Sequence, residues 1–135
     1  MKVFLGGTMN KSQWREQMIP NLECDYFNPM VDSWDEKAQK EEERQKKLCD
    51  YLLFVLTPRM KGVFSIAEVV DASNKSPERT IFCILDEDDG HVWSKIQLKS
   101  LRAVEKLVRA NGAMVFDSLG EITDFLNEKD DGSLL

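Results

Sequence analysis

The sequence predicts an α/β domain with a doubly wound parallel sheet, and two observations indicate it. Five short apolar runs alternate along the chain with five segments of helical pattern, an order typical of parallel strands joined by crossover helices. The most apolar run, CDYLLFVLTP, is continuous instead of alternating, as expected for a strand buried on both faces. With 135 residues, 42% of them hydrophobic, the chain has the size of one compact domain.

The predicted strands are short apolar runs that end at turn residues. KVFLGG ends in two glycines, and the second run ends at Asn28-Pro29. In chain order, the strands are predicted over residues 2–7, 23–29, 49–58, 79–85 and 113–117.

Helices are predicted between and after these strands, from apolar periodicity and capping residues. Ser12 is the expected N-cap of the first helix, and Ser118-x-x-Glu121 forms a capping box for the last one. Asn111-Gly112 ends the fourth helix. The helices are predicted over residues 12–22, 36–48, 64–74 and about 94–110, and after residue 118.

The segment 36–48 is polar on nearly all sides. It carries Glu before Lys at the favourable i,i+4 spacing, for example at Glu42 and Lys46. Such a helix is either largely solvated or has one side that faces a polar cavity. Glu41, Glu42 and Glu43 are most easily interpreted as a solvated charged face.

Right-handed crossovers arrange these elements as a flavodoxin-like, Rossmann-like five-stranded parallel sheet in a three-layer α/β/α sandwich. We expect a single domain over residues 1–127 and a frayed tail over residues 128–135. Ligands of such sheets bind outside the carboxyl ends of the strands. That rule selects the turn Gly6-Gly7-Thr8, Asn28 with the loop after it, and the start of the helix that holds Glu68.

Composition and charge exclude several classes of function. The net charge of −6 argues against duplex nucleic acid or an anionic membrane as the main partner, although a small nucleotide remains compatible with it. No apolar run approaches the ~20 residues that cross a bilayer. The three cysteines have no CxxC spacing and His91 is the only histidine, so we expect no metal, no cofactor, and reduced thiols in a cytoplasmic protein.

Glu68 lies in the apolar stretch GVFSIAEVVDAS and has two interpretations. Ser65-x-x-Glu68 is itself a capping box, in which Ser65 is the N-cap and Glu68 reaches back to its backbone N–H. The same position is also at the carboxyl end of a central strand, where a ligand would lie. Both interpretations can hold together, because a capping carboxylate is also a rigidly held one.

The turn Gly6-Gly7-Thr8 has a similar pair of interpretations. It is either a plain tight turn or a place where backbone N–H groups approach a phosphate or a sugar. Asp50 opens the central strand and either satisfies backbone donors or contacts a ligand.

Aromatic side chains flank the same edge of the predicted sheet. Trp14 and Trp34 either stack on a base or pack beside a helix. Asp32 is either a loop cap or a ligand acceptor. One His in an acidic loop gives no hydrolase triad.

The run KVFLGGT…SQWREQMIP…YFNPMVDSW…CDYLLFVLTPRMKGVFSIAEVVDAS resembles the nucleoside 2-deoxyribosyltransferase-like superfamily, especially its small bacterial and phage branch. The resemblance covers roughly residues 2–85. In this superfamily a glutamate in a small-x-x-E-small-x-x-A segment attacks the anomeric carbon of the sugar, and Glu68 in SIAEVVDA matches it. The resulting glycosyl-enzyme is resolved by a second base or by water.

The resemblance also implies further site residues. A second acid lies eight residues before the aspartate that opens the central strand, which gives Glu42 as a catalytic candidate, with Glu41 and Glu43 as register alternatives. The glycine turn holds sugar or 5′-phosphate in relatives. The candidate substrate-binding residues are Gly6, Gly7, Thr8, Asn28, Asp32, Trp34, Asp50 and Ser65.

One position departs from the family pattern. Transferases of the family carry an aspartate six residues before the nucleophile, where this chain has Gly62. Three hypotheses follow: an enzyme that cleaves or exchanges the N-glycosidic bond of nucleosides or nucleotides, a nucleotide-binding module without turnover, and an interaction protein. Relatives complete the site from a neighbouring subunit, so the resemblance implies a homodimer or larger homo-oligomer.

Overall fold

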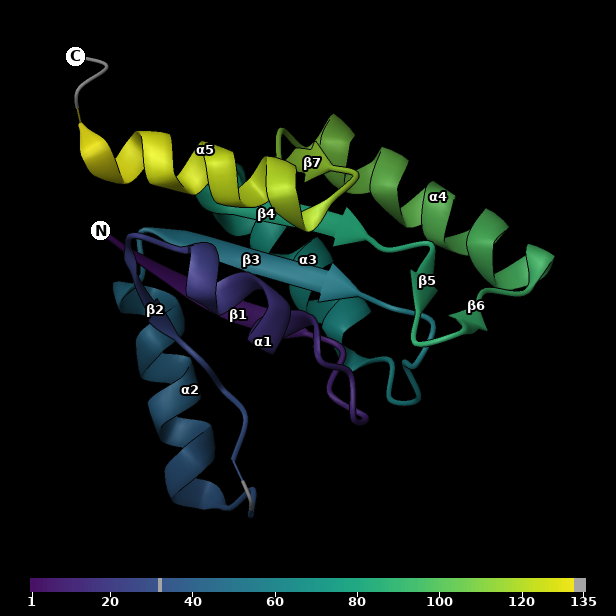
Figure 1. Ribbon diagram of the computed structural model, residues 1–135, viewed down its shortest axis with the longest axis horizontal. Helices are drawn as coiled ribbons and strands as arrows, with labels where there is room; N and C mark the ends of the chain where they lie inside the picture. The colour runs from purple at the N-terminus through teal and green to yellow at the C-terminus, as the bar shows by residue number, and fades with distance from the viewer. Residues whose placement is uncertain (32, 133–135) are drawn as a thin grey trace.

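The computed structural model describes residues 1–31 and 33–132, and a parallel sheet forms its centre (Figure 1). The sheet has the order β2-β1-β3-β4-β7, and all neighbouring strands are parallel. This order, with the first strand between the second and third, confirms the predicted flavodoxin-like, doubly wound arrangement. Its strands are β1 (Lys2–Gly7), β2 (Asp25–Phe27), β3 (Tyr51–Leu56), β4 (Thr80–Ile84) and β7 (Met114–Phe116).

Two layers of helices cover the two faces of this sheet (Figure 1), as the three-layer prediction requires. Helices α1 and α5 pack on one face, and α3 and α4 pack on the other. The α-helices are α1 (Trp14–Met18), α2 (Glu36–Leu48), α3 (Phe64–Lys75), α4 (Lys95–Ala110) and α5 (Leu119–Asp131). Short 3₁₀ turns follow α1 at Ile19–Asn21 and α3 at Pro77–Arg79.

The apolar run of β3 supplies both cores, because alternate residues point to opposite faces. Leu52 and Phe54 belong to the core under α3 and α4, whereas Leu53 and Val55 belong to the core under α1 and α5. All four are at most 4% exposed. The continuous hydrophobicity of this segment therefore reflects burial on both faces.

Helix α2 projects away from the other helices, beside the edge strand β2 (Figure 1). Gln45 is its one buried residue. Asp35 caps the helix by accepting a hydrogen bond from the N–H of Ala38. The projecting position explains the polar sequence of the helix.

Some predicted boundaries were wrong for local reasons. Ser12 is not an N-cap: α1 begins at Trp14 after Gln13, and the Ser12 hydroxyl donates to Asp88 instead. Pro20 converts the end of this helix into a 3₁₀ turn. Helix α5 continues beyond residue 127 to Asp131, and Gly132, at φ 63°, ends it in the left-handed conformation.

The acidic loop after β4 is also more ordered than its composition indicates. It contains a small antiparallel hairpin of β5 (Glu87–Asp88) and β6 (His91–Val92). Arg59, from the loop after β3, forms an ion pair with Asp89 of this hairpin at 3.2 Å.

None of the helices within residues 1–31 and 33–132 has the length and apolar character of a membrane span.

Candidate active site

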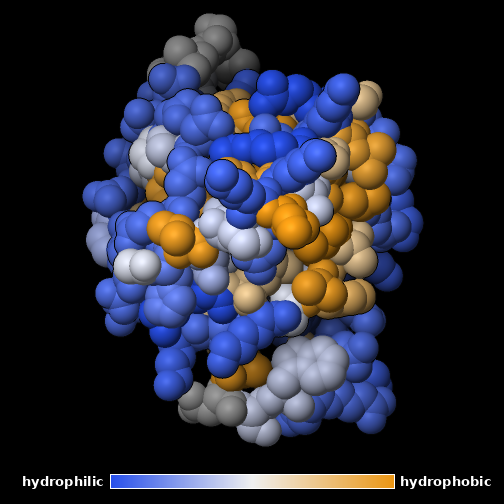
Figure 2. Space-filling view, turned by 90° about the vertical axis from the view of Figure 1, so that its right-hand side faces the viewer, coloured by the Kyte–Doolittle hydropathy of each residue, from blue (hydrophilic) through white to orange (hydrophobic). Residues whose placement is uncertain are grey.

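A cleft with a volume of about 610 Å³ opens at the carboxyl end of β1 and at the loop that follows β2. Helix α2 and the loop before it form one wall, and the start of α3 forms the other. Figure 2 shows the hollow between the lower lobe, which contains α2, and the body of the domain. We call this space the edge cleft; its lining includes Gly6, Gly7, Trp34, Glu42, Lys46, Ser65 and Glu68.

The glycine turn forms the floor of the edge cleft, and Gly7 cannot be replaced without strain. Its φ is +121°, and a Cβ there would lie 2.0 Å from the backbone oxygen of Val55. Thr8 points inward and is 3% exposed. Its N–H donates to Val55 O, and its hydroxyl accepts from the N–H of Thr57, both at 2.9 Å. The structure thus places the two glycines at the cleft and Thr8 behind it.

A fully buried arginine holds the turn from below. Arg15 donates to the carbonyl oxygens of Leu5 at 3.0 Å, Thr8 at 2.8 Å and Gly7 at 3.3 Å. Burial lowers the pKa of Arg15 to about 10, which leaves it protonated at neutral pH. Trp14 is 1% exposed and donates to the same Thr8 oxygen at 3.0 Å. Trp14 is therefore a packing residue of the turn.

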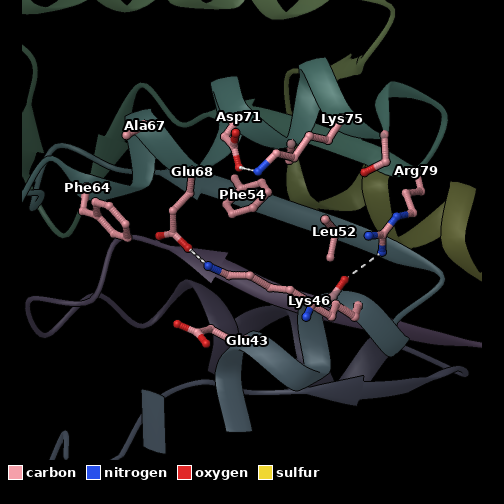
Figure 3. Close-up of a pocket in the computed structure, with 13 residues that line it drawn as sticks. Glu43, Lys46, Leu52, Phe54, Phe64, Ala67, Glu68, Asp71, Lys75 and Arg79 are labelled. Atoms are coloured by element: carbon pink, nitrogen blue, oxygen red, sulfur yellow. Dashed lines mark hydrogen bonds and ion pairs between the residues drawn. The ribbon is translucent and has the colours of Figure 1, made fainter. Parts of the chain in front are cut away.

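Glu68 does not cap its own helix, so the predicted capping box was wrong. Helix α3 begins at Phe64 after Val63, with no side-chain cap, and Ser65 lies inside its first turn. The Glu68 side chain crosses to α2 and forms an ion pair with Lys46 through Oε2 (Figure 3). Its side chain is 12% exposed. The carboxylate is therefore held at the cleft by a neighbouring helix.

A second carboxylate lies on the opposite wall of the edge cleft. Glu42 is 21% exposed and lies 3.9 Å from the same Lys46 ammonium. The indole N–H of Trp34 donates to Glu42 at 3.4 Å, and the Trp34 side chain is exposed. Of the register alternatives, Glu43 also lines the cleft, whereas Glu41 bonds to Arg44 and Gln45 on the helix surface.

Two further predicted site residues, Asn28 and Asp50, lie outside the lining. Asn28 accepts a hydrogen bond from the N–H of Met30 at 3.1 Å and so shapes the turn that carries the rim loop. Asp50 accepts from the N–H of Lys2 at 2.9 Å, at the amino end of β3 and away from the cleft. Asp32 lies outside the described residues.

A second cavity of about 530 Å³ continues from the edge cleft between α2 and α3. Leu52 and Phe54 line it (Figure 3). Ala72 also belongs to its lining. Lys46 and Glu68 line both spaces, which makes their ion pair the boundary between them.

The family model described as nucleoside 2-deoxyribosyltransferase like matches residues 1–87. The chain belongs to this family. No curated protein and no solved structure matches the chain.

Membership in the nucleoside 2-deoxyribosyltransferase-like family suggests glycosyl transfer and a nucleoside as the small-molecule ligand. The matched span runs from β1 to the start of β5 and contains every residue that lines the edge cleft. Helices α4 and α5 lie beyond it and complete the two outer layers. Within residues 1–31 and 33–132, no group of three or more His, Cys, Asp or Glu side chains is arranged to hold a metal ion.

Lys46 is the main site residue of this family member that sequence reasoning missed. Its spacing from Glu42 was noted, but as a helix-surface pair. Its contact with Glu68 joins residues 22 apart, on two helices, and only the fold creates it. Phe64, exposed at the rim of both spaces, was also missed.

Proposed function

We propose that this protein cleaves or exchanges the N-glycosidic bond of (deoxy)nucleosides or nucleotides through a covalent glycosyl-glutamate intermediate on Glu68. The position of Glu68 carries the proposal, because its carboxylate lies in a cleft at the carboxyl edge of a parallel sheet. Family membership supports the reaction class. A volume of about 610 Å³ suits a nucleoside-sized ligand.

In the first step, a carboxylate oxygen of Glu68 forms a bond to C1′ as the bond from C1′ to the base nitrogen breaks. The base leaves with the electron pair of that bond and takes up a proton. Glu68 is then an uncharged ester of the sugar. In the second step, water or another base attacks C1′, loses a proton, and returns Glu68 to its carboxylate form.

The other lining residues have distinct proposed roles. Glu42 faces Glu68 across the cleft and orients the sugar hydroxyls. The exposed Trp34 ring, tethered to Glu42, offers a flat surface on which the base stacks. Gly6 and Gly7 have no side chains, so the sugar can approach their backbone closely.

The test is release of free base from deoxynucleosides and their 5′-monophosphates, followed by chromatography. Glu68→Gln keeps the shape of the side chain and removes its charge, so base release should fall at least about 1,000-fold because the nucleophile is lost. Glu36→Gln is the matched control, since Glu36 is exposed on α2 and its one ion pair among the described residues is with Lys40. Equal rates in the wild type and Glu68→Gln would overturn the assignment of Glu68.

We also propose that the protein forms a homodimer or larger homo-oligomer. Support comes from exposed apolar side chains: Phe64, which lines the cleft, is 72% exposed, and Ile96 at the start of α4 is 79% exposed. An apolar area is visible to the right of centre in Figure 2. Light scattering coupled to size-exclusion chromatography measures the mass directly, and a monomer at the working concentration of the enzyme would contradict this proposal.

A nucleotide-binding module without turnover is the alternative function. Gly62, at the position of the family aspartate, is the observation that favours it: the residue is exposed and has open space where a side chain would be. This alternative predicts that nucleosides or nucleotides raise the melting temperature without release of base. Base release by the wild type, lost in Glu68→Gln, would exclude it.

A further inference from the structure

Lys46 lies between two of the carboxylates of the edge cleft, those of Glu42 and Glu68. Its ammonium forms an ion pair with Glu68 Oε2 and lies 3.9 Å from Glu42 Oε1. The three side chains are 28% exposed at Lys46, 12% at Glu68 and 21% at Glu42, so water screens them only in part. Figure 3 shows the extended Lys46 side chain pointing from α2 toward Glu68 on α3.

Several contacts fix Lys46 in this position. Its carbonyl oxygen accepts a hydrogen bond from Arg79 at 2.9 Å, which holds the last turn of α2 against the body of the domain. Its ammonium lies 5.6 Å from the centre of the Phe4 ring, within range of a cation–π interaction. Lys46 is thus held both at its backbone and at the tip of its side chain. Because its ammonium is fixed, the Glu68 carboxylate that pairs with it is fixed as well.

The other charged side chains near the Lys46–Glu68 pair do not replace Lys46 as the cation of the edge cleft. In the adjoining cavity, Arg79 donates to the carbonyls of Lys46 and Cys49, and Lys75 pairs with Asp71 at 3.0 Å. Lys47 lines that cavity but not the edge cleft, and Glu43 adds a further carboxylate to both spaces. Among the described residues that line the edge cleft, Lys46 is the one cation.

We propose that Lys46 is the positioning residue for the nucleophile: it holds Oε2 of Glu68, offsets the charge of Glu42, and leaves Oε1 of Glu68 to attack the sugar. This inference rests on the proposed function. Within residues 1–31 and 33–132, the structure gives Oε1 no hydrogen-bond or ion-pair partner. One oxygen is therefore anchored and the other is available.

The ion pairs of Lys46 change as the charge of Glu68 changes during the proposed reaction. When Oε1 bonds to C1′ and the base leaves, Glu68 becomes a neutral ester and Lys46 keeps Glu42 as its anionic partner. When water or a second base attacks C1′, the carboxylate of Glu68 is released and its ion pair with Lys46 forms again. No proton or electron passes through Lys46, so its effect is on geometry and on the charge balance of the two acids.

The test uses full-length protein with Lys46→Met, which keeps the aliphatic stem without the charge, and Lys46→Arg, which restores a cation. A misaligned nucleophile slows the chemical step after the substrate has bound. Lys46→Met should therefore lower kcat about 100-fold with little change in KM. Two facing carboxylates without a cation are harder to ionise together, so the acidic limb of its pH–rate profile should move to higher pH. Lys46→Arg should recover a large part of kcat and the original limb.

Lys40→Met is the matched control, because Lys40 is exposed on the same helix and, within the part of the chain that the structure describes, forms an ion pair with Glu36 alone. Urea unfolding of each variant separates a folding defect from a kinetic one, and Lys46→Gln replaces Lys46→Met if the latter does not fold. Wild-type kcat and an unchanged pH profile in Lys46→Met would overturn this inference and leave the proposed function standing. A wild type that releases no base would overturn the proposed function and this inference with it.

Discussion

The buried guanidinium of Arg15 is predicted to be a main support of the cleft floor. Arg15→Met keeps an unbranched apolar stem and removes three donors to the carbonyls of Leu5, Gly7 and Thr8. Thr8 keeps the indole N–H of Trp14 as a donor, so the loss falls on the other two oxygens. Each buried carbonyl left unpaired costs about 1–3 kcal/mol. Removal of the buried charge offsets part of this cost, because the variant no longer has to desolvate a guanidinium. The free energy of unfolding should therefore fall by about 3 kcal/mol.

Equilibrium unfolding in urea measures this loss. With a slope of about 2 kcal/mol per molar urea, the midpoint of Arg15→Met should be roughly 1.5 M lower than that of the wild type. Arg44→Met is the control, because Arg44 is 61% exposed and its pair with Glu41 should contribute less than about 1 kcal/mol. If Arg15→Met unfolds at the same urea concentration as Arg44→Met, the support assigned to Arg15 is wrong.

Four further predictions concern the ligand and the thiols. Trp34→Ala should raise KM about 10-fold and change kcat little if its ring stacks on the base, whereas Trp34→Phe should stay near the wild type; a fall in kcat alone would contradict stacking. Among the described residues, the lining of the edge cleft has three carboxylates and one ammonium, so deoxynucleosides should have a higher kcat/KM than their 5′-monophosphates, and the reverse order in steady-state assays would refute this. Burial raises the pKa of Cys83 to about 12 from an ordinary value of 9.0, and all three cysteines are buried and free, so a thiol reagent at pH 8 should label them only after unfolding in urea. Because the unfolded thiol loses its proton first, the contribution of Cys83 to folding stability is present below pH 9 and is lost as pH rises toward 12, which unfolding curves across that range would show.

The elements that the sequence predicted best are those determined by local residue patterns and by burial. The predicted helix over residues 36–48 matches α2, because its start has a local cap at Asp35 and its end meets the next strand. The continuous apolar run predicted β3 at the centre of the sheet, since alternate residues such as Leu53 and Phe54 each find a core. Strand order then followed from the handedness of crossovers.

The features that sequence reasoning missed depend on contacts between distant segments. Ser65-x-x-Glu68 has the pattern of a capping box, but the chain enters α3 from a turn in which Met60 N–H bonds to Thr57 O, and the helix begins before Ser65 can cap it. Glu68 is then free to meet Lys46, a partner that no local pattern marks. Ser12 similarly bonds to Asp88, which is 76 residues away in the chain.

The central claim is that Glu68 becomes covalently attached to the sugar. The most direct measurement is peptide mass spectrometry of protein quenched during turnover with a deoxynucleoside. We predict a deoxyribosyl adduct on the peptide that contains Glu68, formed by the wild type and absent from Glu68→Gln. An adduct on a different peptide, or base release by Glu68→Gln at the wild-type rate, would contradict it.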